Sequence, residues 1–153
     1  MQRVVREQRL GYVATVNADG TPNLSPKGTT TVWDEDHLIF ADLRSPGTVE
    51  NLRSNPGVEV NVVDPFLRKG YRFKGTAEVF TDGAFFQEAI GFFGEGHDAV
   101  ERPDERINSV VLIRVDRAQP LISPAYELGV TEEETVAQWE RYYEDLPRPG
   151  KGS

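Results

Sequence analysis

The chain has 153 residues, a formal net charge of −8 and no cysteine. This length is typical of a single domain, and the absence of cysteine excludes disulfides, thiolate metal sites and cysteine nucleophiles. The charged N-terminus lacks the apolar core of a secretory signal, and no apolar run approaches the ~20 residues of a membrane span. We therefore expect one soluble, cytoplasmic domain that does not bind a membrane.

The two halves of the chain differ in charge. Residues 1–75 carry ten Lys and Arg against nine acids, whereas residues 76–153 carry seven against sixteen. An acidic surface argues against nucleic acid as a partner. An anionic ligand is therefore expected to bind the N-terminal half, where positive charge is locally available.

Strand and helix patterns follow one another along the chain. In chain order we predict strands at 10–16, 22–33 and 38–41, a short helix that begins at Pro46 and ends before Asn55, strands at 58–63 and 71–80, a helix at 84–93, a strand at 109–115 and a helix at 131–146 that opens with Thr131 and Glu134. Six strands joined mostly by short turns predict a mainly β fold, closed as a barrel or packed as a sandwich, with the terminal helix packed outside. Residues 1–146 are expected to form the domain and residues 147–153 a disordered tail.

Several kinds of chemistry find no support in the sequence. The two histidines, His37 and His97, are far apart, whereas a zinc or non-haem iron site normally uses two or more with short spacing. The chain has neither a glycine-rich phosphate loop nor a nucleophile elbow. No acidic residue lies in an apolar run that would raise its pKa. We therefore predict no metal site and identify no catalytic residue.

Two polar segments in the basic half suggest a ligand site. In the strand at 22–33, Ser25 and Lys27 point to one face, Pro26 cannot donate to a ladder, and Gly28 allows close approach. At the start of the short helix, Arg44, Ser45 and Thr48 lie beside unpaired backbone N–H groups that attract phosphate. The alternative for the second segment is a simple helix cap with one solvent-facing arginine.

A third segment, residues 68–75, contains four cations. Its alternation places Tyr71 and Phe73 on one face of a strand and Arg72 and Lys74 on the other. Such a basic stripe is commonly a solvated face. In an acidic protein it needs either nearby acids or an anionic ligand.

Taken together, these segments resemble the pyridoxamine-5′-phosphate-oxidase-like, FMN-binding split-barrel family. The first hairpin of that family is similar to GYVATVNADGTPNLSPKG, and its phosphate turn, short helix and following strand are similar to LIFADLRSPGTVENLRSNPGVEV. Its next barrel strand is similar to KGYRFKGTAEV. The resemblance covers roughly residues 8 to 118 and is closest to small flavin-nucleotide-binding members with an S-P-K-G strand.

The resemblance implies a six-stranded, Greek-key split barrel and a homodimer that binds FMN in a groove between two barrels. By position, the residues expected near the flavin ring and ribityl chain are Ser25, Lys27, Gly28 and Asn51. Those expected at the phosphate are Arg44, Ser45 and Thr48. Lys69 or Arg72 would reach the flavin from the same or the partner subunit.

Departures from the family limit the expected function. Gly47 and Thr48 stand where the oxidase has an arginine and lysine pair, and its C-terminal Arg-x-His pair is missing, so vitamin B6 chemistry is not expected. Three functions stay open: an FMN-dependent oxidoreductase that uses NAD(P)H or a small-molecule substrate, a non-catalytic flavin carrier or sensor, and a split barrel that binds F420 or haem.

Overall fold

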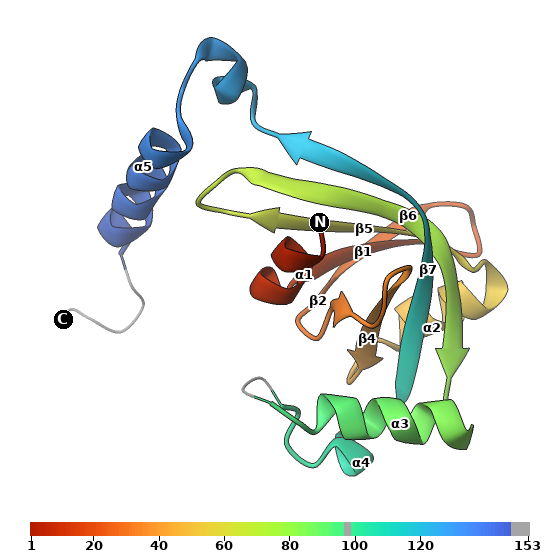
Figure 1. Ribbon diagram of the computed structural model, residues 1–153. Coiled ribbons are helices and arrows are strands. Elements are labelled where there is room, and N and C mark those ends of the chain that lie inside the picture. Colours follow the sequence, from red (N-terminus) through yellow and green to blue (C-terminus); the bar gives the residue numbers. More distant parts are fainter. Residues whose placement is uncertain (97–98, 148–153) are drawn as a thin grey trace.

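The computed structural model describes residues 1–96 and 99–147, and its main feature is one antiparallel sheet that curls into a split barrel (Figure 1). The strands are β1 (Gly11–Val16), β2 (Pro22–Lys27), β3 (Thr31–Val32), β4 (His37–Asp42), β5 (Gly57–Asp64), β6 (Lys69–Phe80) and β7 (Ser109–Ile122). Their order across the sheet is β2-β1-β5-β6-β7-β4-β3. The predicted mainly β split barrel is confirmed. His97 and residues 148–153 of the predicted tail lie outside the described residues.

The sheet has seven strands, so the prediction of six is wrong. The stretch at 22–33 is interrupted by a tight turn, in which the carbonyl of Lys27 accepts from the backbone N–H of Thr30 at 3.3 Å and from its hydroxyl at 2.9 Å. The part before the turn pairs with β1, and the part after it pairs with β4. One sequence stretch therefore supplies both edges of the sheet, which face each other across the split.

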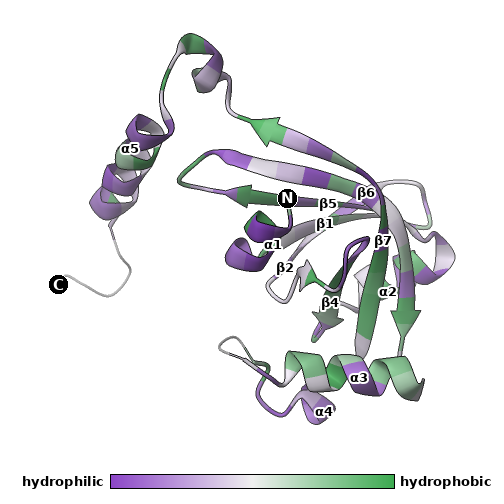
Figure 2. Ribbon diagram, in the orientation of Figure 1, coloured by the Kyte–Doolittle hydropathy of each residue, from purple (hydrophilic) through white to green (hydrophobic). Residues whose placement is uncertain are grey.

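Hydrophobic side chains pack on both faces of the sheet. Leu38 and Phe40 point into the inner core with Val60 and Ile113, whereas Ile39 and its neighbours pack against a helix on the outer face. Because β4 is covered on both faces, its sequence is a continuous apolar run. Figure 2 shows hydrophobic residues along β4, β7 and that helix.

Five α-helices and one short 3-10 helix accompany the sheet in the described residues. They are α1 (Gln2–Gln8), α2 (Pro46–Ser54), α3 (Gly83–Phe93), α4 (Pro103–Arg106), the 3-10 helix η1 (Pro124–Leu128) and α5 (Glu132–Asp145). The predicted helices correspond to α2, α3 and α5, while α1, α4 and η1 were not predicted. None of the helices in residues 1–96 and 99–147 is long and apolar enough to cross a membrane.

The C-terminal part differs most from the prediction. β7 continues to Ile122, beyond the predicted end at residue 115, because residues 117–122 pair with residues 69–74 of β6. The register of this pairing shifts between Lys74 and Gly75 of β6, which marks a bulge. The helix α5 has both hydrogen bonds of the predicted capping box, between Thr131 and Glu134. It projects beyond the barrel, however, and contacts the tip of the β5–β6 hairpin (Figure 1).

Candidate anion-binding site

The first two predicted segments meet across the split of the barrel. The ammonium of Lys27, at the end of β2, donates to the hydroxyl of Ser25 at 2.5 Å and to the hydroxyl of Ser45 at 2.7 Å. Ser45 precedes α2, on the chain segment that follows β4. Side chains about twenty residues apart in sequence thus form one polar seam between β2 and α2.

Lys27 is a buried cation without a buried counter-ion in contact with it. Its side chain is only 4% exposed, and no ion pair among residues 1–96 and 99–147 includes it. Burial lowers the pKa of Lys27 from its ordinary value, and attraction to the buried Asp42 opposes this shift. An ammonium held in this way is destabilised unless an anion reaches it.

The N-terminus of α2 is open toward the seam. Ser45 occupies the cap position but makes no side-chain capping bond, because its hydroxyl accepts from Lys27. Its own backbone N–H donates to Asp42 at 2.6 Å. Pro46 has no N–H, and the N–H groups of Gly47 and Thr48 have no partner within a helix. Ser45 therefore does not cap the helix with its side chain, although Arg44 is solvent-exposed as that alternative expected. The N–H groups of Gly47 and Thr48 follow Ser45, whose hydroxyl contacts Lys27.

Two glycines leave space around the seam. A Cβ atom added at Gly28 or at Gly47 would meet no atom within 4 Å. The backbone at both positions is therefore accessible to a ligand. β2 is moreover an edge strand, as the proline at position 26 indicated.

Asn51 ties α2 to the neighbouring strand. Its amide donates to Thr15 at 3.0 Å and to Asn17 at 2.9 Å, while Asn23 also donates to Thr15, at 3.1 Å. The sequence predicted Asn51 as a site residue. It did not predict Thr15, Asn17, Asn23 or Asp42. The sequence contained a signal for Thr15, because this polar residue lies on the same face of β1 as the buried Val13.

The third segment lies apart from the seam within one chain, because β1 and β5 separate β2 from β6. Lys69 forms an ion pair with Glu132 at 2.6 Å, and Arg72 forms one with Glu59 at 2.8 Å. Nearby acids thus account for two cations of the basic stripe. The structure brings together Ser25, Lys27, Ser45 and the start of α2, and leaves Arg44 exposed on the same turn.

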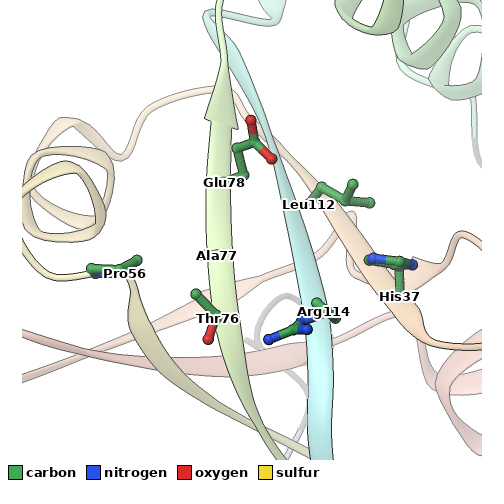
Figure 3. A pocket seen from close by; sticks show the side chains of 7 residues that line it. All are labelled: His37, Pro56, Thr76, Ala77, Glu78, Leu112 and Arg114. Carbon is green, nitrogen blue, oxygen red and sulfur yellow. The ribbon is translucent and has the colours of Figure 1, made fainter.

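A separate groove of about 450 Å³ lies on the outer face of the sheet (Figure 3). It is lined by His37, Pro56, Thr76, Ala77, Glu78, Leu112 and Arg114. The imidazole Nδ1 of His37 is 2.8 Å from a carboxylate oxygen of Asp34, which fixes the ring against the turn before β4. None of the predicted site residues lines this groove.

Comparison with known proteins decides the family. Residues 1–119 match the pyridoxamine 5′-phosphate oxidase family. This chain belongs to that family. The arm formed by η1 and α5 lies beyond the matched residues.

Two solved structures and one curated protein are similar to this member of the family. HupZ of Group A Streptococcus is 33% identical, with a TM-score of 0.69 over 80% of this chain and 92% of HupZ. A candidate pyridoxamine 5′-phosphate oxidase of Lactobacillus delbrueckii is 28% identical, with a TM-score of 0.60 over 74% of this chain and 90% of its own. An uncharacterised protein of Methanocaldococcus jannaschii is 27% identical over 111 residues, 71% of this chain and 70% of that protein.

The same fold occurs in two cofactor-related proteins at lower identity. An FMN-binding protein of Syntrophomonas wolfei is 12% identical, with a TM-score of 0.62 over 78% of this chain and 84% of its own. An F420 reductase is 21% identical, with a TM-score of 0.58 over 77% of this chain and 94% of its own. At these identities the likeness concerns the fold alone.

Proposed function

We propose that this protein is a homodimeric flavin-binding protein that holds FMN along the seam between β2 and α2. The observation that carries the proposal is the buried ammonium of Lys27, which faces two serine hydroxyls and the open start of a helix. A phosphate group would supply the missing negative charge. Membership of the pyridoxamine 5′-phosphate oxidase family supports a flavin nucleotide as the source of that phosphate.

The hydrogen-bond geometry supports a position for the phosphate end of the ligand beside Lys27 and Ser45. Lys27 and Ser45 share a hydrogen bond, so both would contact the same phosphate. The N–H groups of Gly47 and Thr48 would add donors and the positive end of the helix dipole. Arg44 is exposed and can approach from outside the turn. The sequence placed Lys27 beside the ring, and the geometry instead favours its position at the phosphate.

The rest of the flavin would lie along β2. The free edge of this strand, the hydroxyl of Ser25 and the accessible backbone at Gly28 suit the ribityl chain and one edge of the ring. Asn51 lies on the α2 side of the seam, with its amide nitrogen already bound to β1, so its carbonyl oxygen is the group that could accept from a ribityl hydroxyl. Lys69 and Arg72 would contribute from a second subunit, because two strands separate them from β2 in their own chain.

A bound flavin would supply the redox chemistry, while the protein binds and orients it. We therefore assign the protein as an oxidoreductase whose electron donor is NAD(P)H or a small molecule. In the described part of the seam, the buried ionisable side chains are Lys27 and Asp42, and both are engaged in structural hydrogen bonds. A non-catalytic flavin carrier is the alternative, and only an activity measurement separates the two.

The absorption spectrum of the purified protein is the direct test. The spectrum of oxidised flavin is expected, whereas a spectrum shifted to shorter wavelength would indicate F420 and an intense Soret band would indicate haem. Oxidation of NAD(P)H in steady state would identify an enzyme. A colourless protein that also fails to bind added FMN would refute the proposed function.

Arg44 provides a second test at the phosphate. Arg44→Ala is expected to weaken FMN binding by about 1–3 kcal/mol, the range for one charge-assisted hydrogen bond. Titration of the apoprotein with FMN measures the effect, with Arg53→Ala in the last turn of α2 as the control. Equal affinity of wild type and Arg44→Ala would return Arg44 to a surface role.

A further inference from the structure

Two surfaces carry most of the exposed large hydrophobic side chains. Of twelve such side chains in the described residues, six lie on the C-terminal projection and the hairpin tip below it: Phe66, Ile122, Leu128, Tyr142, Tyr143 and Leu146. Four more lie on β1 and β2 or directly before them: Leu10, Tyr12, Val16 and Leu24. Concentrations of this kind mark interaction surfaces rather than the scattered exposure of ordinary proteins. We call the first surface the arm face and the second the β1–β2 face.

The arm projects from the barrel and contacts the tip of the β5–β6 hairpin (Figure 1). Contacts between the arm and the tip of the β5–β6 hairpin are the Lys69–Glu132 ion pair at 2.6 Å, the Arg68 guanidinium 3.4 Å from the ring centre of Trp139, the Tyr126 hydroxyl donating to the carbonyl of Leu67 at 2.6 Å, and the rings of Phe66 and Tyr143 at 5.5 Å. These contacts fix the orientation of α5. All four join the arm to residues 66–69 of the tip.

The hairpin tip is too small to cover the aromatic side of α5. Trp139, Tyr142 and Tyr143 form an aromatic group packed mainly edge to face, with ring centres 5.2 to 6.4 Å apart. Tyr142 is still 51% exposed, and Leu128 of η1 is 86% exposed. The arm thus presents an ordered aromatic surface with one side uncovered.

The β1–β2 face has the complementary chemistry. Pro22, Leu24 and Pro26 alternate along β2 and are all exposed, and Pro26 lies directly opposite Tyr12. Proline rings pack well on aromatic side chains, as the aromatic grooves that bind proline-rich peptides show. Because two prolines of β2 have no N–H, this strand favours a contact through its side chains over the addition of another strand.

We propose that the arm face docks on the β1–β2 face of a second copy of this chain, and that the second copy makes the same contact in return. One chain carries both surfaces, which is the requirement of a two-fold interface. In residues 1–96 and 99–147, the hydrogen bonds, ion pair and ring contacts that join the arm to the rest of its own chain all involve the hairpin tip, and none involves β1 or β2. The arm would therefore reach this face in another copy. The inference rests on the homodimer of the proposed function and does not need the flavin.

Cysteine cross-linking of the apoprotein tests the contact directly, because the chain has no native cysteine. Leu24→Cys and Tyr142→Cys chains are co-expressed and treated with a short bismaleimide. A covalent dimer is expected. Glu144→Cys, which lies about half a turn away from Tyr142 on the opposite side of α5, is the matched control and should give little cross-linking with Leu24→Cys. Equal yields for the two arm positions would overturn the proposal.

A double variant and light scattering complete the test. In a chain with both Leu24→Cys and Tyr142→Cys, cross-links within one chain would show that the arm packs on its own barrel and would overturn the proposal. Tyr142→Glu is expected to raise the dimer dissociation constant at least about 10-fold. Glu144→Gln, on the opposite side of α5, is expected to leave it unchanged. A dimer insensitive to Tyr142→Glu would also refute the contact. All of these measurements use the flavin-free protein. A failure of the arm contact is therefore distinguished from a failure of flavin binding.

Discussion

Replacing Lys27 by methionine removes the charge at the centre of the proposed site and keeps a side chain of similar length. Lys27 is 4% exposed and donates to Ser25 and Ser45. A hydrogen bond to a charged group in such a setting contributes about 1.5–3 kcal/mol. The FMN dissociation constant is therefore expected to rise about 10- to 100-fold.

The stability of the apoprotein gives the second half of this prediction. A buried ammonium without an ion pair costs free energy in the folded state, and methionine removes that cost while filling the same space. The loss of attraction to Asp42 acts in the opposite direction. We therefore expect the free energy of unfolding of Lys27→Met to equal or exceed that of wild type.

Fluorescence titration with FMN and urea unfolding of the apoprotein measure the two effects. Lys74→Met, which removes an exposed lysine on the outer face of β6, is the matched control and should change neither. A Lys27→Met protein that binds FMN as wild type does, but unfolds at lower urea, would show that Lys27 only supports the fold. That result would refute the assignment of Lys27 to the phosphate.

Three further predictions follow from the same geometry. Burial is the main cause that lowers the pKa of Lys27 from its ordinary 10.5, so between the lowered pKa and 10.5 the unfolded chain binds more protons at this site than the folded chain does. The free energy of unfolding of the wild-type apoprotein, relative to that of Lys27→Met, should therefore rise with pH through this window. FMN affinity should fall over the same window, because Lys27 loses its charge. Urea unfolding and titration over that pH range check both slopes, and parallel curves for the two proteins would contradict them. Gly75→Ala should destabilise the fold by at least about 2 kcal/mol, because the added Cβ would clash with the backbone carbonyl oxygen of Arg114. Gly28→Ala should not destabilise it, because a Cβ at Gly28 meets open space. Chemical denaturation measures the free energy of unfolding of both variants. Asn51→Ala should lower the free energy of unfolding by about 1–2 kcal/mol because it removes the link from α2 to Thr15, and an unchanged urea midpoint would exclude that link.

Local sequence patterns predicted most of the strands and the three longest helices, because those elements are specified by neighbouring residues. The alternation of 58–63 matches the burial of β5, and the capping residues of α2 and α5 lie where the helices begin. Local signals failed where pairing with a distant strand decides the structure. The polar end of β7 is a strand only because β6 pairs with it, and the short β3 exists because a turn redirects the chain to β4.

The candidate site divides in the same way. The sequence by itself indicated that Ser25 and Lys27 share a face, that Pro26 lies on an edge strand, and that a phosphate could bind where α2 begins. Only the tertiary structure showed that Lys27 bonds to Ser45 across the split, and that Glu132 pairs with Lys69. Side-chain direction along one strand follows from its period of two, whereas the meeting of two sheet edges depends on the curl of the whole sheet. No short window of sequence contains that curl.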